Sequence, residues 1–75
     1  MDTLPIHNHL KEKGYIRTHT YPEFGARYAS KDSAITILMT YAHIFLYDKN
    51  GPGTCVEPRY CFIHNGQLRI GKYRI

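Results

Sequence analysis

Cysteine and histidine are the residue types here with the widest chemistry, because both bind metals and both take part in catalysis. Cys55, Cys61 and His64 lie closest together in the sequence. A fourth ligand would have to come from one of the other histidines, which are His7, His9, His19 and His43. Zinc sites usually draw on two cysteines separated by roughly two to four residues, whereas five residues separate these two. We therefore predict no metal site and no cofactor.

Histidine is also the commonest general base, which makes catalysis the next possibility. His19, His43 and His64 are candidate bases, and Arg69 could stabilise a phosphate, as in a small ribonuclease. However, no pattern brings a named acid and base together, and there is no glycine-rich phosphate loop, nucleophile elbow or pair of carboxylates. We predict no catalytic residue and expect the protein not to be an enzyme.

Aromatic and basic residues alternate along the segments with strand-like patterns. We predict that one face of a sheet gathers them; the residues are Tyr15, Arg17, His19, Tyr21, Tyr60, Phe62, Arg69 and Tyr73. Such a face suits single-stranded nucleic acid, because bases stack on rings and phosphates meet cations. Exposed aromatic patches mark interfaces of several kinds, however. A protein partner, a nucleic acid and a second copy of the chain are therefore all candidate occupants.

The elements that would position this face depend on residues 34–47, which contain no Gly, Pro or charge. The composition favours a strand, but the length and the periodicity favour a helix. The less apolar positions recur every three or four residues, and they are Ser33, Thr36, Thr40, His43, Tyr47 and Asn50. Asp32 suits the start of a helix and Gly51 its end, so we predict a buried helix over about 32–49. The alternative is a long bent strand that turns through residues 48–51 into a hairpin.

The flanking segments predict strands and one further helix. Thr3, Pro5 and Gly14 are typical of the start and end of a short N-terminal helix. Residues 15–21 alternate like a strand, and residues 23–29 are ambiguous. Asn65-Gly66 predicts a type I′ hairpin, which pairs His64 with Gln67, Ile63 with Leu68 and Phe62 with Arg69, and places Glu57 opposite Arg74.

Together these segments predict an α+β fold: a small two-layer domain with a central buried helix (about 32–49) against a three-stranded sheet. The predicted strands span about 15–21, 55–64 and 67–74, with a C-terminal β-hairpin and a short N-terminal helix. The 75 residues predict one domain, residues 1–75. A chain of this length buries only about 60% of its unfolded surface, so self-association or a partner would stabilise it.

The composition indicates the cellular compartment in which we expect the protein. The formal net charge is +4, with the charged residues dispersed along the chain, and there are seven tyrosines and no tryptophan. The first ten residues lack the pattern of a signal peptide, so we expect reduced cysteines and a cytoplasmic protein. The uncharged run of fourteen residues is shorter than the roughly 20 that a membrane span needs. We predict no membrane segment.

These observations predict a small non-enzymatic binding protein. It would dock on a macromolecular partner, as a regulator or inhibitor does, through the aromatic and basic sheet face. A nucleic-acid-handling complex is one such partner. The alternative is direct binding of single-stranded nucleic acid by the same face.

Overall fold

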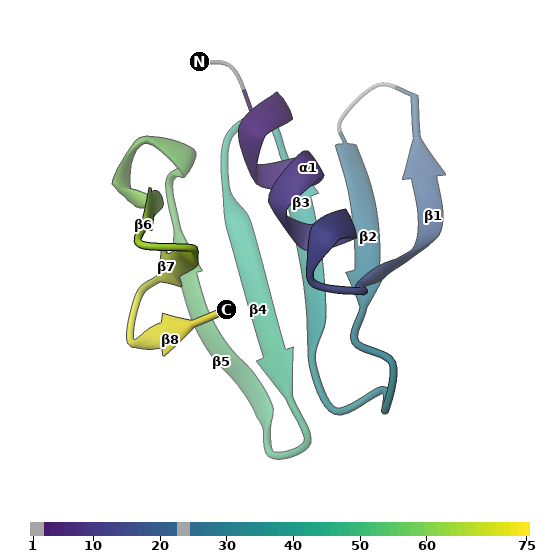
Figure 1. Ribbon diagram of the computed structural model, residues 1–75. Coiled ribbons are helices and arrows are strands. Elements are labelled where there is room, and N and C mark those ends of the chain that lie inside the picture. The colour runs from purple at the N-terminus through teal and green to yellow at the C-terminus, as the bar shows by residue number, and fades with distance from the viewer. Residues whose placement is uncertain (1–2, 23–24) are drawn as a thin grey trace.

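In the computed structural model, residues 3–22 and 25–75 are described, and most of them form strands (Figure 1). One α-helix, α1 (Leu4–Glu12), precedes them. The strands that follow are β1 (Ile16–Tyr21), β2 (Gly25–Ala29), β3 (Thr36–Thr40), β4 (Ile44–Asp48) and β5 (Gly51–Val56). After a 3-10 turn at Pro58–Tyr60 come β6 (Phe62–His64), β7 (Gln67–Ile70) and β8 (Tyr73–Arg74). None of the described helices is long and apolar enough to cross a membrane.

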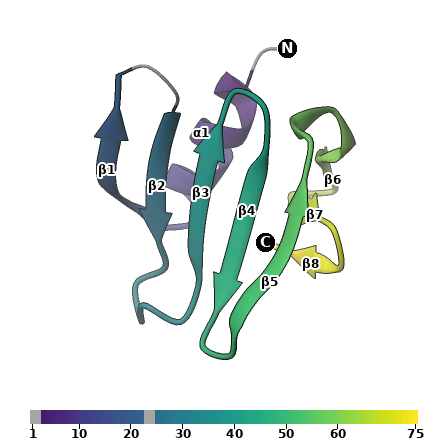
Figure 2. The same cartoon turned by 180° about the vertical axis from the view of Figure 1, so that it is seen from behind.

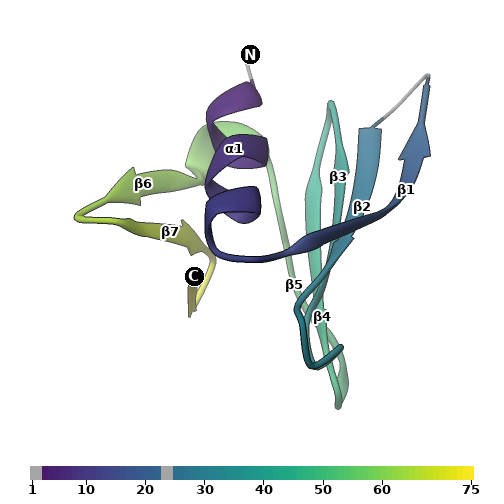
Figure 3. The same cartoon turned by 45° about the vertical axis from the view of Figure 1, so that its right-hand side comes forward.

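The first five strands form one antiparallel sheet in chain order, and the last three form a small second sheet. Helix α1 and the small sheet both lie on the same side of the large sheet (Figures 1 and 3). From the opposite side the large sheet is open to view across β1–β5 (Figure 2). The large sheet therefore has a covered inner face and an open outer face.

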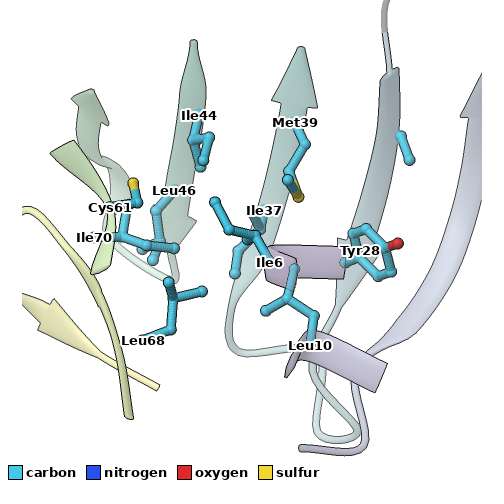
Figure 4. Packing of buried hydrophobic residues seen from close by; sticks show 11 residues of the cluster. Ile6, Leu10, Tyr28, Ile37, Met39, Ile44, Leu46, Cys61, Leu68 and Ile70 are labelled. Atoms are coloured by element: carbon cyan, nitrogen blue, oxygen red, sulfur yellow. The ribbon is translucent and has the colours of Figure 1, made fainter. Parts of the chain in front are cut away.

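The hydrophobic core fills the space between the inner face, α1 and the small sheet (Figure 4). The large sheet contributes Ala26, Tyr28, Ile37, Met39, Ile44 and Leu46, α1 contributes Ile6 and Leu10, and the C-terminal segment contributes Cys61, Leu68 and Ile70. Alternate residues of β3 and β4 point inward, as the pleat of a strand requires. The core is thus built mainly from one face of the sheet.

The predicted central helix over about 32–49 is wrong, and with it the three-stranded sheet, because these residues form β3, β4 and their turns. The hydroxyl of Thr40 accepts hydrogen bonds from the backbone N–H groups of Ala42 and His43, and donates one to the carbonyl of His43. Thr40 and His43, which resembled a polar helix stripe, instead close the β3–β4 turn. Asp32 caps the β2–β3 turn by accepting from Ala34 N–H at 3.1 Å.

The remaining strand limits also differ from the prediction. The interval 55–64 contains the end of β5, the 3-10 turn and β6, while 67–74 is divided between β7 and β8. The ambiguous residues 23–29 include β2, and residues 23 and 24 lie outside the described residues. The alternative interpretation of the central stretch did contain the hairpin at 48–51, where Asp48 pairs with Gly51.

The C-terminal hairpin and the N-terminal helix have their predicted places. The hairpin pairs the residues in the predicted register, which joins His64 to Gln67, Ile63 to Leu68 and Phe62 to Arg69. Asn65 and Gly66 have φ values of 51° and 75°, as a turn with two positive φ angles requires. The predicted opposition of Glu57 and Arg74 is wrong: Arg74 pairs with Arg69, and Glu57 binds Arg59.

Candidate binding surfaces

The eight residues predicted to share one face lie in several places. His19 and Tyr21 lie on the outer side of β1, while Phe62 and Arg69 pair in the small sheet. The other four are apart from these pairs: Tyr15 packs against the core, Arg17 binds Tyr28, Tyr60 lies in the 3-10 turn, and Tyr73 binds Asp48. The structure therefore brings together two pairs on two different surfaces.

Arg17 belongs to a polar cluster above the core. Its guanidinium donates to the hydroxyl of buried Tyr28 at 2.7 Å, and that hydroxyl lies 2.6 Å from Nδ1 of His7. Burial, then the charges of Arg17 and Lys11, hold the pKa of His7 below its ordinary value. Nδ1 of a neutral His7 can accept a hydrogen bond from the Tyr28 hydroxyl, so these side chains satisfy one another. This cluster fixes β1 and α1 and is structural.

The first candidate surface is the outer sheet face, defined here by His19, Tyr21, Arg27, Leu38, Phe45, Tyr47 and Cys55. One row crosses the whole sheet, because His19 pairs with Arg27, Arg27 with Leu38, Leu38 with Phe45, and Phe45 with Cys55. The rings of His19 and Tyr21 stack, with centroids 5.9 Å apart and planes 4° from parallel. A continuous strip of side chains results, basic at β1 and apolar at its centre.

Large apolar side chains at the centre of this face are only half-buried. Leu38, Phe45 and Tyr47 have this intermediate exposure, although they lie in the middle of a five-stranded sheet. Within residues 3–22 and 25–75, no helix or strand covers them (Figure 2). An antiparallel sheet with a solvated face normally shows polar residues there. The centre of this face is therefore more apolar than is usual for a solvated sheet face.

The second candidate surface is the hairpin face, defined by Phe62, His64, Gln67, Arg69 and Arg74. It is the side of the small sheet that faces away from buried Leu68 and Ile70. Phe62 pairs with Arg69 and Arg69 with Arg74, so a ring and two guanidiniums form one row, and His64 and Gln67 form the next. All five line a hollow of about 540 Å³.

Charge is distributed very unevenly between the two parts of the chain. Residues 1–57 contain six basic and six acidic residues, whereas residues 58–75 contain four basic residues and no acidic one. The C-terminal segment therefore carries the whole formal net charge of +4. Three of its cations, Arg69, Lys72 and Arg74, lie in or beside the small sheet.

Specific contacts fix the small sheet to the large one. The hydroxyl of Tyr73 donates to the carboxylate of Asp48 at 2.7 Å, and this bond keeps the pKa of Asp48 low and that of Tyr73 high. The ring of Tyr73 lies so close to Gly53 that a Cβ there would collide with the hydroxyl. Imidazole Nε2 of His9 lies 2.7 Å from the carbonyl of Ile75. The hairpin face therefore has a fixed position.

The cysteines lie in different environments. Cys55 is exposed at the end of the outer sheet row, whereas Cys61 is buried beneath the small sheet, and burial raises the pKa of its thiol. Both are free thiols. In the described part of the chain, no three His, Cys, Asp or Glu side chains are grouped so that they could hold a metal ion.

Sequence reasoning missed Arg27, Leu38, Phe45, Tyr47 and Arg74. Leu38 and Phe45 were assigned to the apolar face of a buried helix and Tyr47 to its less apolar stripe, so none of them was expected on a sheet face. Arg27 belongs to the ambiguous segment. Arg74 was expected opposite Glu57, because the second tight turn at Gly71, which folds β8 back beside β7, was not predicted.

Comparisons with protein-family models, with curated proteins and with solved structures found no match to this chain. Its class therefore rests on its own fold and surfaces. These define a small, strand-rich protein with one helix, an apolar outer sheet face and a basic hairpin face.

Proposed function

We propose that this is a non-enzymatic binding protein that docks on a protein partner through the outer sheet face. The observation that carries the proposal is the partial exposure of Leu38 and Phe45, two large apolar side chains at the centre of a five-stranded sheet. Removing apolar surface from water stabilises an interface by about 25 cal/mol per Å² before the costs of association. A partner that covers this strip would supply the second layer that the sheet lacks on this side.

The charges of the face indicate the kind of partner. His19 and Arg27 lie at its β1 side, and the outward strand positions of the described residues include no carboxylate. A protein surface with an apolar centre and an acidic margin would complement this pattern. A chain of 75 residues with such a face suits a regulator or inhibitor that occludes a site on a larger protein, including one in a nucleic-acid-handling complex.

The test uses immobilised protein, a cell extract and a double variant, Leu38→Ser with Phe45→Ser. The control double variant, Tyr60→Ser with Ile63→Ser, also removes one aromatic and one aliphatic side chain, both exposed and both off the large sheet. We expect the Leu38/Phe45 variant to capture the partner at least tenfold less well, because central apolar contacts dominate most interfaces. The control should capture it like the original protein.

Nuclease treatment of the extract and size measurement distinguish the other occupants. A partner retained after nuclease treatment is a protein, whereas loss of all capture would replace the protein partner with a nucleic acid. Concentration-dependent dimerisation abolished by Leu38→Ser with Phe45→Ser would make a second copy of the chain the occupant. Equal capture by both double variants would remove the outer sheet face from the function.

A further inference from the structure

We infer that the hairpin face is a binding site for a nucleoside phosphate group, with the base on Phe62 and the phosphate between Arg69 and Arg74. This site lies on the small sheet and does not depend on the docking role of the outer sheet face. The same chemical group occurs in free nucleotides and in single-stranded nucleic acids. The site would therefore take either ligand.

Two cations oppose each other on the hairpin face. Arg69 and Arg74 are cross-strand partners, an arrangement that destabilises a sheet when both residues have the same charge. Both side chains are exposed. Among the described residues, the one ion pair joins Arg59 to Glu57, and no side-chain hydrogen bond involves either of the opposed arginines. An anion between two guanidiniums would relieve their repulsion and accept several N–H donors.

An exposed aromatic ring lies beside the two cations. Phe62 is 58% exposed and is the direct neighbour of Arg69 in the same row. Strands in a sheet lie about 4.8 Å apart, so the row from Phe62 to Arg74 spans about 10 Å. A flat base on Phe62 would place its phosphate over the arginines. Exposed aromatic rings that bind bases in this way tolerate any sequence.

The hollow around these residues has the size and the polar groups that a nucleotide would need. The hollow of about 540 Å³ lies within the range of about 300–1,000 Å³ for small-molecule sites. His64 and Gln67 lie in the adjacent row, where an imidazole and an amide can donate to and accept from the edge of a base. The surplus of four positive charges in residues 58–75 attracts a phosphate from a distance.

The experiment titrates the full chain with three probes: inorganic phosphate, adenosine monophosphate and a fluorescent oligothymidylate of about ten nucleotides. The test variants are Arg69→Gln with Arg74→Gln, and Phe62→Leu. The matched control is Lys31→Gln with Lys49→Gln, which also removes two exposed cations, both from turns of the large sheet and outside either face. Circular dichroism verifies that each variant keeps the fold, which we expect because all these side chains are exposed.

We expect the double arginine variant to lose at least tenfold in affinity for the nucleotide and the oligonucleotide. We expect Phe62→Leu to lose about fivefold or more, with little change in the double lysine variant. Tighter binding of the oligonucleotide identifies a strand as the ligand, and equal binding of the monophosphate identifies a free nucleotide. No binding of either, equal losses in the double lysine variant, or inorganic phosphate binding as tightly as the monophosphate would overturn the inference.

Discussion

The outer sheet face and the hairpin face are both exposed sides of antiparallel sheets, but they differ in almost every physical property. The first is built around Leu38 and Phe45, with His19 and Arg27 at its β1 side. The second pairs two arginines beside one ring and lies in a segment with no acidic residue. The outer face of the large sheet is thus mainly apolar, and the hairpin face of the small sheet is mainly charged.

Because of this difference, the two faces would recognise their partners by different forces. Burial of apolar area is insensitive to salt and needs a wide complementary surface. Contacts between arginines and phosphates are local, directional and weakened by salt. A protein of 75 residues can in this way carry two contact surfaces that do not compete for the same partner.

The largest loss of stability should come from replacing Leu68, which holds the small sheet, and it should far exceed the loss from replacing Leu38. Leu68 is fully buried and holds the small sheet on the core, whereas Leu38 lies on the outer sheet face. We expect Leu68→Ala to lower the free energy of unfolding by about 2–5 kcal/mol. Leu38→Ala should lower it by less than about 1 kcal/mol, because it leaves no buried cavity. Urea denaturation measures both, and equal losses would show that Leu38 is part of the stabilising core.

Gly53→Ala should have a smaller effect on stability, and it should affect binding at the hairpin face but not at the outer sheet face. The added methyl group would displace the ring of Tyr73 and break its hydrogen bond to Asp48. We expect a loss of roughly 1–3 kcal/mol in stability, typical of an overpacked site. Binding of oligothymidylate to the hairpin face should weaken, while capture of a protein partner by the outer sheet face should persist. Ser in place of Asn50, in the exposed β4–β5 turn, is the matched control.

Salt should distinguish the two faces with a more modest change. If Arg69 and Arg74 together neutralise one phosphate of a single strand, affinity should fall about two- to threefold between roughly 50 and 200 mM salt. Capture through Leu38 and Phe45 should change less than about twofold over the same range. Titrations at several salt concentrations give both slopes. A steep slope for the protein complex would mean that charge, not apolar area, holds the outer sheet face to its partner.

Sequence patterns predicted the small sheet better than the large one, and the two faces explain why. The hairpin turn at Asn65 and Gly66 needs two positive φ angles, which few residue types adopt readily, so its register could be predicted. In β3 and β4 the inward residues are apolar, and so are Leu38 and Phe45 on the outside. The alternation that marks a half-buried strand was therefore absent.

The remaining errors came from local turns and from contacts distant in sequence. The threonine and histidine of the β3–β4 turn, Thr40 and His43, have the spacing of a helix stripe, and only their hydrogen bonds show that they close a turn. Of the predicted site, the pairing of Phe62 with Arg69 could be obtained from the sequence. Arg74 and the outer sheet face required the fold, because residues from five strands create that surface.

Acid should have the smallest effect on stability. It should weaken the contacts of His7 first and those of Asp48 at a lower pH. The pKa of His7 lies below its ordinary value of 6.5, chiefly because of burial, so the folded protein favours the neutral imidazole. The unfolded chain takes up this proton first, so stability should decline as the pH falls below about 6.5 and be unaffected by His7 above it. The pKa of Asp48 lies below 3.8 because Tyr73 donates to its carboxylate. That contribution is present above about pH 3.8 and disappears as the pH falls further.

Acid should therefore loosen the corner of α1 and β1 before it releases the small sheet. Thermal unfolding at about pH 7.5, 5 and 3 measures the two steps. His7→Gln should remove the decline between the first two values, because glutamine does not titrate, and leave the decline at the lowest pH. The matched variant Asp48→Asn should keep the first decline and reduce the one at the lowest pH. The rest of that second decline belongs to Asp32, whose pKa is also lowered by its hydrogen bonds with Ser30 and Ala34. An unchanged decline above pH 5 in His7→Gln would assign that step to another group and leave the polar cluster at Tyr28 without a role in acid stability.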